Sequence, residues 1–141
     1  MIKLVDENGL RLKQNLNIGE DTLLKIGECE YEMIQLLRKI NVSRPVALTL
    51  ACLSKGKEIS SQNIEVVSGL RQPEVSVAMR YLRENDWVDI REEKRTEGKG
   101  RPIKLYRLTV SMDRIFSKIE EKIIAESRLA LHNIQRLKSL A

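Results

Sequence analysis

The sequence predicts a mainly α-helical fold with a small β-hairpin, in which a short N-terminal helix and a compact core precede a long C-terminal helix. Apolar residues recur with helical period in several segments before residue 84. The period changes to two around residues 87–90 and 103–108, and the helical period returns from about residue 111 onward. Of the 141 residues, 42% are hydrophobic and 32% are charged, which indicates a packed domain rather than a disordered chain.

The composition excludes several classes of protein. The 25 Lys and Arg residues exceed the 20 Asp and Glu residues, giving a net charge of +5 that permits a polyanionic partner. No run of about 18 uncharged apolar residues exists, so we expect no transmembrane helix. Acidic residues within the first seven positions and the lack of an apolar signal core predict a cytoplasmic protein. Cys29 and Cys52 form no paired motif, and we expect both to be reduced thiols in the core.

The N-terminal region divides into two parts. Residues 1–20 alternate in hydropathy around Asn8-Gly9, which is compatible with a hairpin or with a disordered tail, and both readings stay open. From Asp21, a candidate N-cap, apolar residues follow helical spacing and predict an N-terminal helix over residues 21–43, which Gly27 could split. The residue before a proline avoids the α region, so this helix should end before Pro45.

Three short helices are expected next. The first spans about residues 45–53 and ends before Gly56, and the second opens at residue 60 or 61 and stops at Ser68-Gly69. The third starts at residue 72 or 73. Its buried face should consist of Val75, Ala78, Met79 and Leu82. Two strands joined by a polar loop over residues 91–102 complete the order of a winged helix-turn-helix domain, which we assign to residues 44–110.

The third helix should present a polar face away from the core. On this face we expect Arg71, Gln72, Glu74, Ser76, Val77, Arg80 and Arg83. A single helix fits the major groove of DNA, where Arg pairs with guanine and Gln with adenine. A charged helix alone is more often only solvated, but here a basic hairpin follows it.

The loop between the two strands concentrates positive charge. Residues 91–107 hold seven basic and three acidic side chains, a net charge of +4. The candidate contacts to phosphates or to an adjacent minor groove are Lys94, Arg95, Lys99, Arg101 and Lys104. A solvated hairpin is the alternative, because three glutamates dilute this charge.

The segment from Ser60 to Thr109 resembles the winged helix-turn-helix domains of transcriptional regulators of the MarR, ArsR and TrmB kinds. The run from Gly98 to Thr109, GKGRPIKLYRLT, looks like the wing of many archaeal regulators and is the most specific part. The resemblance covers about 50 of the 141 residues and implies a regulator that binds double-stranded DNA. These families usually carry Gly between the recognition helix and the strand, where this chain has Asn85-Asp86, two residues that tolerate the left-handed region.

The C-terminal segment, residues 111–141, is expected to form a dimerisation helix. About 28 helical residues would extend roughly 42 Å, longer than a small core can cover. The candidate interface residues are Phe116, Ile119, Ile123, Ala130, Ile134 and Leu137. A homodimer would place two recognition helices about one DNA turn apart, opposite the two halves of a pseudo-palindrome.

Other functions have weaker support. The sequence has no catalytic motif, no phosphate-binding glycine loop and only one histidine, His132, so we expect neither an enzyme nor a metal or cofactor site. Two alternatives to a DNA-binding regulator stay open. One is a winged-helix adaptor that binds other proteins in a transcription or replication assembly. The other is a pocket for a small-molecule effector between the N- and C-terminal helices, although no residue identifies a ligand.

Overall fold

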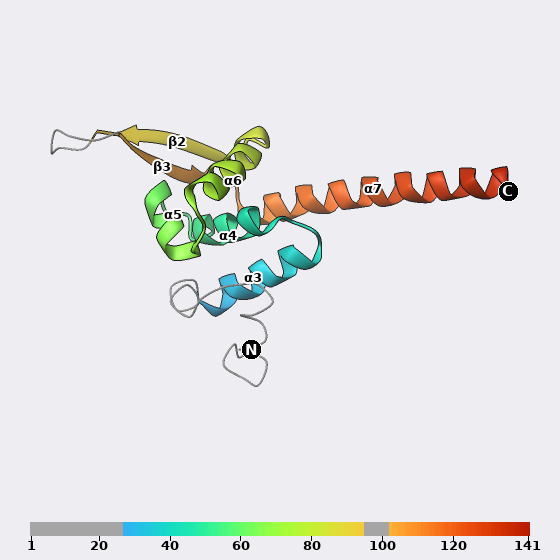
Figure 1. The fold of residues 1–141 in the computed structure, drawn as a ribbon, viewed down its shortest axis with the longest axis horizontal. Coiled ribbons are helices and arrows are strands. Elements are labelled where there is room, and N and C mark those ends of the chain that lie inside the picture. Colours follow the sequence, from blue (N-terminus) through green and yellow to red (C-terminus); the bar gives the residue numbers. More distant parts are fainter. Residues whose placement is uncertain (1–26, 95–101) are drawn as a thin grey trace. The chain divides into compact units, whose positions relative to one another are not determined.

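The computed structural model describes residues 27–94 and 102–141, which fall into two compact units, Met1–Thr109 and Val110–Ala141. The described part of the first unit holds four helices and three strands (Figure 1). In chain order these are α3 (Glu28–Lys39), α4 (Arg44–Leu53), β1 (Ile59–Ser60), α5 (Ser61–Ser68), α6 (Gln72–Glu84), β2 (Val88–Glu93) and β3 (Ile103–Leu108). The second unit is one helix, α7 (Met112–Leu140).

Helix α4 forms the centre of the first unit. Every residue from Val46 to Ala51 is buried, and so is Leu53, which means that the helix is covered on all sides. A helix that is apolar all round is stable in water only when other elements surround it. Helices α3, α5 and α6 and strand β3 all contact α4, and they therefore form one core around it.

Helix α3 begins at Glu28, inside the span over which the sequence predicts an N-terminal helix. Gly27 is its N-cap and has φ 86°, a left-handed conformation that favours glycine. Within the described residues, Gly27 thus marks the start of a helix rather than a break inside one. Asn41, with φ 69°, ends the segment before α4. The hairpin or tail expected over residues 1–20 and the N-cap expected at Asp21 lie outside the described residues.

The sheet contains a strand that the sequence analysis did not predict. Its order is β1-β3-β2, with both pairs antiparallel, and Ile59 of β1 pairs with Tyr106 of β3. A strand of two residues is too short to show alternating hydropathy. Ser60 ends β1 and also caps α5, because its Oγ accepts the backbone N–H of Asn63 at 3.1 Å. The sheet therefore leads directly into the helix-turn-helix.

Two left-handed residues set the turns on either side of α6. Gly69, with φ 75°, ends α5 and allows the short turn into α6. At the other end, Asp86 has φ 58°, so the junction keeps the left-handed residue that glycine usually supplies. The Thr109 hydroxyl donates to the carbonyl oxygen of Asp86 at 3.0 Å and holds this turn. The described elements form a mainly α winged helix-turn-helix followed by a long C-terminal helix, which confirms the predicted fold class.

Helix α7, taken by itself, is 29 residues long, or about 43 Å at 1.5 Å per residue. Its N-cap is Ser111, whose Oγ accepts the backbone N–H of Arg114 at 3.2 Å. Its two buried residues are Ile115 and Ile119, both in the first third of the helix. Almost all of the helix beyond them is exposed, including several large apolar side chains.

We predict that Leu48→Ala lowers the free energy of unfolding by about 2–5 kcal/mol, because Leu48 is fully buried in α4 and its loss leaves a cavity. Urea unfolding followed by circular dichroism, at one protein concentration, measures the change. Val66→Ala removes apolar atoms from a side chain that is 62% exposed and should stay within about 0.5 kcal/mol of the wild type. Equal losses in the two variants would contradict the central position of α4.

Candidate nucleic-acid interface

Helix α6 has one buried face and one exposed face. The four residues that the sequence assigns to the core, Val75, Ala78, Met79 and Leu82, are all buried. The helix contacts α4, α5 and β2. Because α4 and α6 bury these side chains between them, the polar face of α6 is directed to solvent.

Most of the predicted recognition residues lie on this exposed face. The exposed members are Arg71, Gln72, Ser76, Val77, Arg80 and Arg83. None of the three arginines forms an ion pair with another residue in the described ranges 27–94 and 102–141. Their guanidinium groups are therefore available to a polyanion. Arginine is suited to this role because it stays charged and presents a rigid set of donors.

Glu74 differs from the other predicted recognition residues. One carboxylate oxygen, Oε1, accepts the backbone N–H of Arg71 at 3.1 Å and so caps the start of α6. The other, Oε2, lies 3.3 Å from Nη1 of Arg44 at the start of α4. With both oxygens in use and only 38% of its side chain exposed, Glu74 orients α6 relative to α4. The sequence alone gives no sign of the Arg44 contact, because the two residues are 30 positions apart.

Gln72 and Ser76 are linked on the exposed face of α6. The side-chain amide nitrogen of Gln72 donates to Oγ of Ser76 at 3.0 Å, one helical turn along. This bond uses one of the two amide hydrogens of Gln72 and leaves the second hydrogen and the carbonyl oxygen available. One donor and one acceptor are what an adenine edge requires in the major groove.

Arg91 holds the base of the hairpin to the segment that precedes β1. Its Nη2 lies 2.6 Å from Oε1 of Glu58 and its Nε lies 3.1 Å from Oε2, a two-bond contact to the residue before β1. Glu93 lies on the same guanidinium at 3.6 Å. The hydrogen bonds from Arg91 are the main cause that lowers the pKa of Glu58. Since Glu58 is 33 positions away, the sequence alone gives no sign that Arg91 has an acidic partner.

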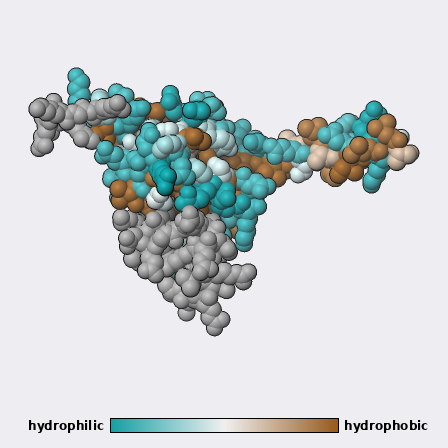
Figure 2. All heavy atoms as spheres, viewed as in Figure 1, coloured by the Kyte–Doolittle hydropathy of each residue, from teal (hydrophilic) through white to brown (hydrophobic). Residues whose placement is uncertain are grey.

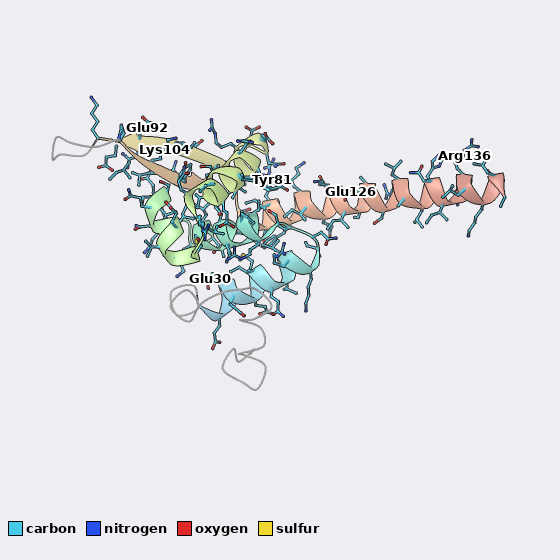
Figure 3. The ribbon with its side chains drawn as sticks, viewed as in Figure 1. Glu30, Tyr81, Glu92, Lys104, Glu126 and Arg136 are labelled. Carbon is cyan, nitrogen blue, oxygen red and sulfur yellow. The ribbon has the colours of Figure 1, made fainter. Side chains whose placement is uncertain are left out.

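Acidic residues balance the rest of the described hairpin. In the strand register Glu92 lies opposite Lys104 and Asp89 lies opposite Arg107, and Figure 3 shows Glu92 and Lys104 together toward one end of the hairpin. With Glu58 included, four acidic residues accompany the four basic ones of residues 88–94 and 102–108. These described residues, which form the base of the hairpin, therefore have a formal net charge of zero when Glu58 is counted with them. Lys94 is exposed just after β2, and the other predicted wing contacts, Arg95, Lys99 and Arg101, lie outside the described residues.

Trp87 joins the hairpin to α6. It is buried, and its ring meets Tyr81 edge-on, with centroids 5.9 Å apart and an interplanar angle of 74°. The backbone N–H of Thr109 donates to the carbonyl oxygen of Trp87 at 2.9 Å. The hairpin is thus fixed to the C-terminal end of α6.

The predicted dimerisation residues on α7 differ in exposure. Phe116, Ala130, Ile134 and Leu137 are exposed and Ile123 is half-buried. Ile119 is only 8% exposed, which leaves little of its surface for a partner. Four further large apolar residues of α7 are exposed: Ile124, Leu129, Leu131 and Leu140. Figure 2 shows apolar residues gathered along the C-terminal part of this helix.

The described residues give little support for metal binding, for a membrane span or for thiol chemistry. They contain no group of three His, Cys, Asp or Glu side chains that could hold a metal ion. None of the described helices combines the length and the apolar character needed to cross a membrane. The expectation of two core thiols is half wrong, because Cys29 is exposed while α3 turns Tyr31 and Ile34 inward. Cys52 is partly buried, and desolvation raises the pKa of its thiol to about 11, which makes it a poor nucleophile.

We predict that Glu58→Gln destabilises the protein at neutral pH and that this difference shrinks in acid. The pKa of Glu58 is lowered from 4.5 in the folded chain, so its ionisation adds stability above that pH. This contribution is lost as the pH falls through the folded pKa. Urea unfolding of both proteins should give a constant difference from pH 7 to about pH 5 and a falling difference below it.

The control for this prediction is the same substitution in an Arg91→Gln background. With the guanidinium gone, most of the pH-dependent difference between the protein that keeps Glu58 and the protein that carries Glu58→Gln should disappear. If the difference in unfolding free energy keeps its full pH dependence in the Arg91→Gln background, Arg91 is not the cause of the lowered Glu58 pKa.

Comparisons with known proteins identify no family for the chain. No protein-family model matches it, and no curated protein matches it. Among solved structures, NadR in complex with 4-hydroxyphenylacetate aligns with 99% of this chain and 86% of its own, at 12% identity and a TM-score of 0.48. The YusO protein from Bacillus subtilis aligns with 99% of this chain and 100% of its own, at 21% identity and a TM-score of 0.42. Both scores are low, so the fold assignment rests on the elements described above.

Proposed function

We propose that the chain is a sequence-specific regulator of transcription that binds double-stranded DNA as a homodimer. The observation that carries this proposal is the exposed face of α6, which combines three arginines without an ion pair among the described residues and a glutamine with a free donor and acceptor. Arg and Gln are the side chains that pair most specifically with guanine and adenine in the major groove. A solvated helix requires neither this combination nor a hairpin beside it.

The two parts of the domain would have different roles. Helix α6 would enter the major groove, with Gln72 and Arg80 reading base edges and Arg71 and Arg83 available to bases or phosphates. The wing would contact the DNA backbone or the adjacent minor groove. Because the described base of the hairpin, Lys94 included, is formally neutral, we assign these contacts mainly to Arg95, Lys99 and Arg101, with Lys94 at the edge of the loop. Lys104, opposite Glu92, would contribute less.

The proposed homodimer rests on α7. Its exposed apolar side chains extend over most of its length, a pattern that an isolated helix in water does not favour. Phe116, Ile134 and Leu137 are the exposed large residues that we assign to the interface. Two such chains would present their recognition helices about 34 Å apart, so the preferred DNA site should be a pseudo-palindrome with half-sites one turn apart.

We predict that the protein binds duplex DNA at low salt and that the logarithm of the binding constant falls linearly with the logarithm of the salt concentration. Each phosphate that the protein neutralises releases counterions and makes this negative slope steeper by about 0.9. Fluorescence anisotropy with a labelled duplex, repeated between about 50 and 200 mM salt, measures this slope. Failure to bind any duplex at low salt would refute the proposed function.

We predict different effects for the two classes of contact. Gln72→Ala or Arg80→Ala should weaken binding to the preferred site by about 1–3 kcal/mol. Each should also relax the preference for one base at the position that the substituted residue contacts. Arg101→Ala should weaken binding to all sequences alike and reduce the salt slope by about 1. Binding titrations against a set of single-base-pair variants of the preferred site separate the two patterns.

A charge-neutral control uses the ion pair at the base of the hairpin. The double variant Glu58→Gln/Arg91→Gln removes one acid and one base that neutralise each other, so its salt slope should equal that of the wild type. A slope that falls as far as in Arg101→Ala would show that Arg91 also meets a phosphate and is not neutralised by Glu58.

The alternative function is a winged-helix adaptor for other proteins. The observations that favour it are the neutral base of the hairpin and two exposed valines, Val66 on α5 and Val77 on α6. Binding of an adaptor to its protein partner should not depend on Lys99 or Arg101. If Lys99→Ala and Arg101→Ala each weaken binding to duplex DNA, the result favours the DNA-binding function over the adaptor.

A further inference from the structure

Val77 is an apolar residue on the polar face of α6. It is 55% exposed, and Arg80, which lies three positions further on the same face, is charged and exposed. Its exposure means that it contributes little to the core. Valine also forms helices less readily than alanine, because its branched Cβ restricts the side chain against the preceding turn. Neither core packing nor helix stability therefore accounts for valine at this position.

The major groove offers one apolar group for such a side chain to contact. Base edges there present hydrogen-bond donors and acceptors, and thymine alone adds a C5-methyl group. A valine side chain ends in two methyl groups and has no donor or acceptor, so the thymine methyl is the only group by which it could discriminate among bases. The Gln72–Ser76 pair on the same helix leaves a donor and an acceptor for a base edge, so α6 carries a polar and an apolar candidate for reading bases.

We propose that Val77 is a specificity-determining residue that selects thymine by contact with its C5-methyl group. This inference rests on the proposed function, because it places the exposed face of α6 in the major groove. The preferred site should therefore contain a required thymine in each half-site. Removing either partner of the contact, the valine methyls or the thymine methyl, should have the same effect on binding.

The test starts from a duplex selected in vitro with the wild-type full-length protein from a randomised pool. Each thymidine of the selected site is then replaced singly by deoxyuridine, which keeps base pairing and lacks only the methyl group. For the wild type, one replacement per half-site should weaken binding about three- to fivefold, the effect of exposing one methyl group. For Val77→Ala, the thymidine and deoxyuridine duplexes should bind equally at that position.

Val66→Ala is the matched control, because it makes the same chemical change at a valine that is 62% exposed on α5. This variant should discriminate thymidine from deoxyuridine as the wild type does. Since alanine is the better helix former, Val77→Ala should fold at least as well as the wild type, which circular dichroism checks.

The possible failures are distinguishable. If no duplex is enriched or bound, the proposed function fails, and the role of Val77 fails with it. If a duplex is bound but contains no required thymine, or if no deoxyuridine replacement weakens binding, only the role of Val77 is refuted. A replacement that weakens wild type and Val77→Ala by the same factor also refutes it, because another residue then contacts the methyl group.

Discussion

The burial of α4 is the constraint on which the first unit depends. This helix has no polar face, so α3, α5, α6 and β3 must pack around it to remove it from water. Once α6 turns its four apolar residues toward α4, its rotation about its own axis is fixed, and the remaining side chains are directed to solvent. Glu74 then fixes the start of α6, through its bonds to the Arg71 backbone and to Arg44. The proposed reading face is thus a consequence of the core, and substitutions in α4 should affect it without touching DNA.

The distribution of charge divides the surface into two functional parts. On the hairpin, acids from three places in the chain neutralise the described base, and the contact between Arg91 and Glu58 holds β2 to the segment before β1. On the exposed face of α6, no acid among the described residues pairs with the three arginines, so their positive charge is not neutralised locally. Among the described residues, positive charge without an acidic partner is therefore concentrated on the exposed face of α6.

The sequence predicts the fold class well and the site less completely. Helical spacing identified the buried face of α6, and Asn85-Asp86 was correctly read as a turn that keeps a left-handed residue, which the structure places at Asp86. The sequence does not reveal strand β1, because two residues are too few to show alternating hydropathy. The pairing of this strand also depends on Tyr106, which lies far along the chain. The role of Glu74 and the neutralisation of Arg91 were missed for a similar reason, since both depend on partners about thirty positions away. Cys29 was placed wrongly because a single residue beside an apolar run does not reveal which face of the helix it occupies. The wing contacts Arg95, Lys99 and Arg101 and the dimer interface on α7 stay predictions.

The central claim is that the face of α6 from Gln72 to Arg83 reads the major groove. The most direct measurement replaces guanines of a bound duplex, one at a time, with 7-deazaguanine, which removes a major-groove acceptor, or with inosine, which removes the minor-groove amino group. The account predicts that 7-deazaguanine weakens binding at one or more positions in each half-site, and that inosine at the same positions has little effect. Sensitivity to inosine alone, with every 7-deazaguanine duplex bound normally, would contradict it.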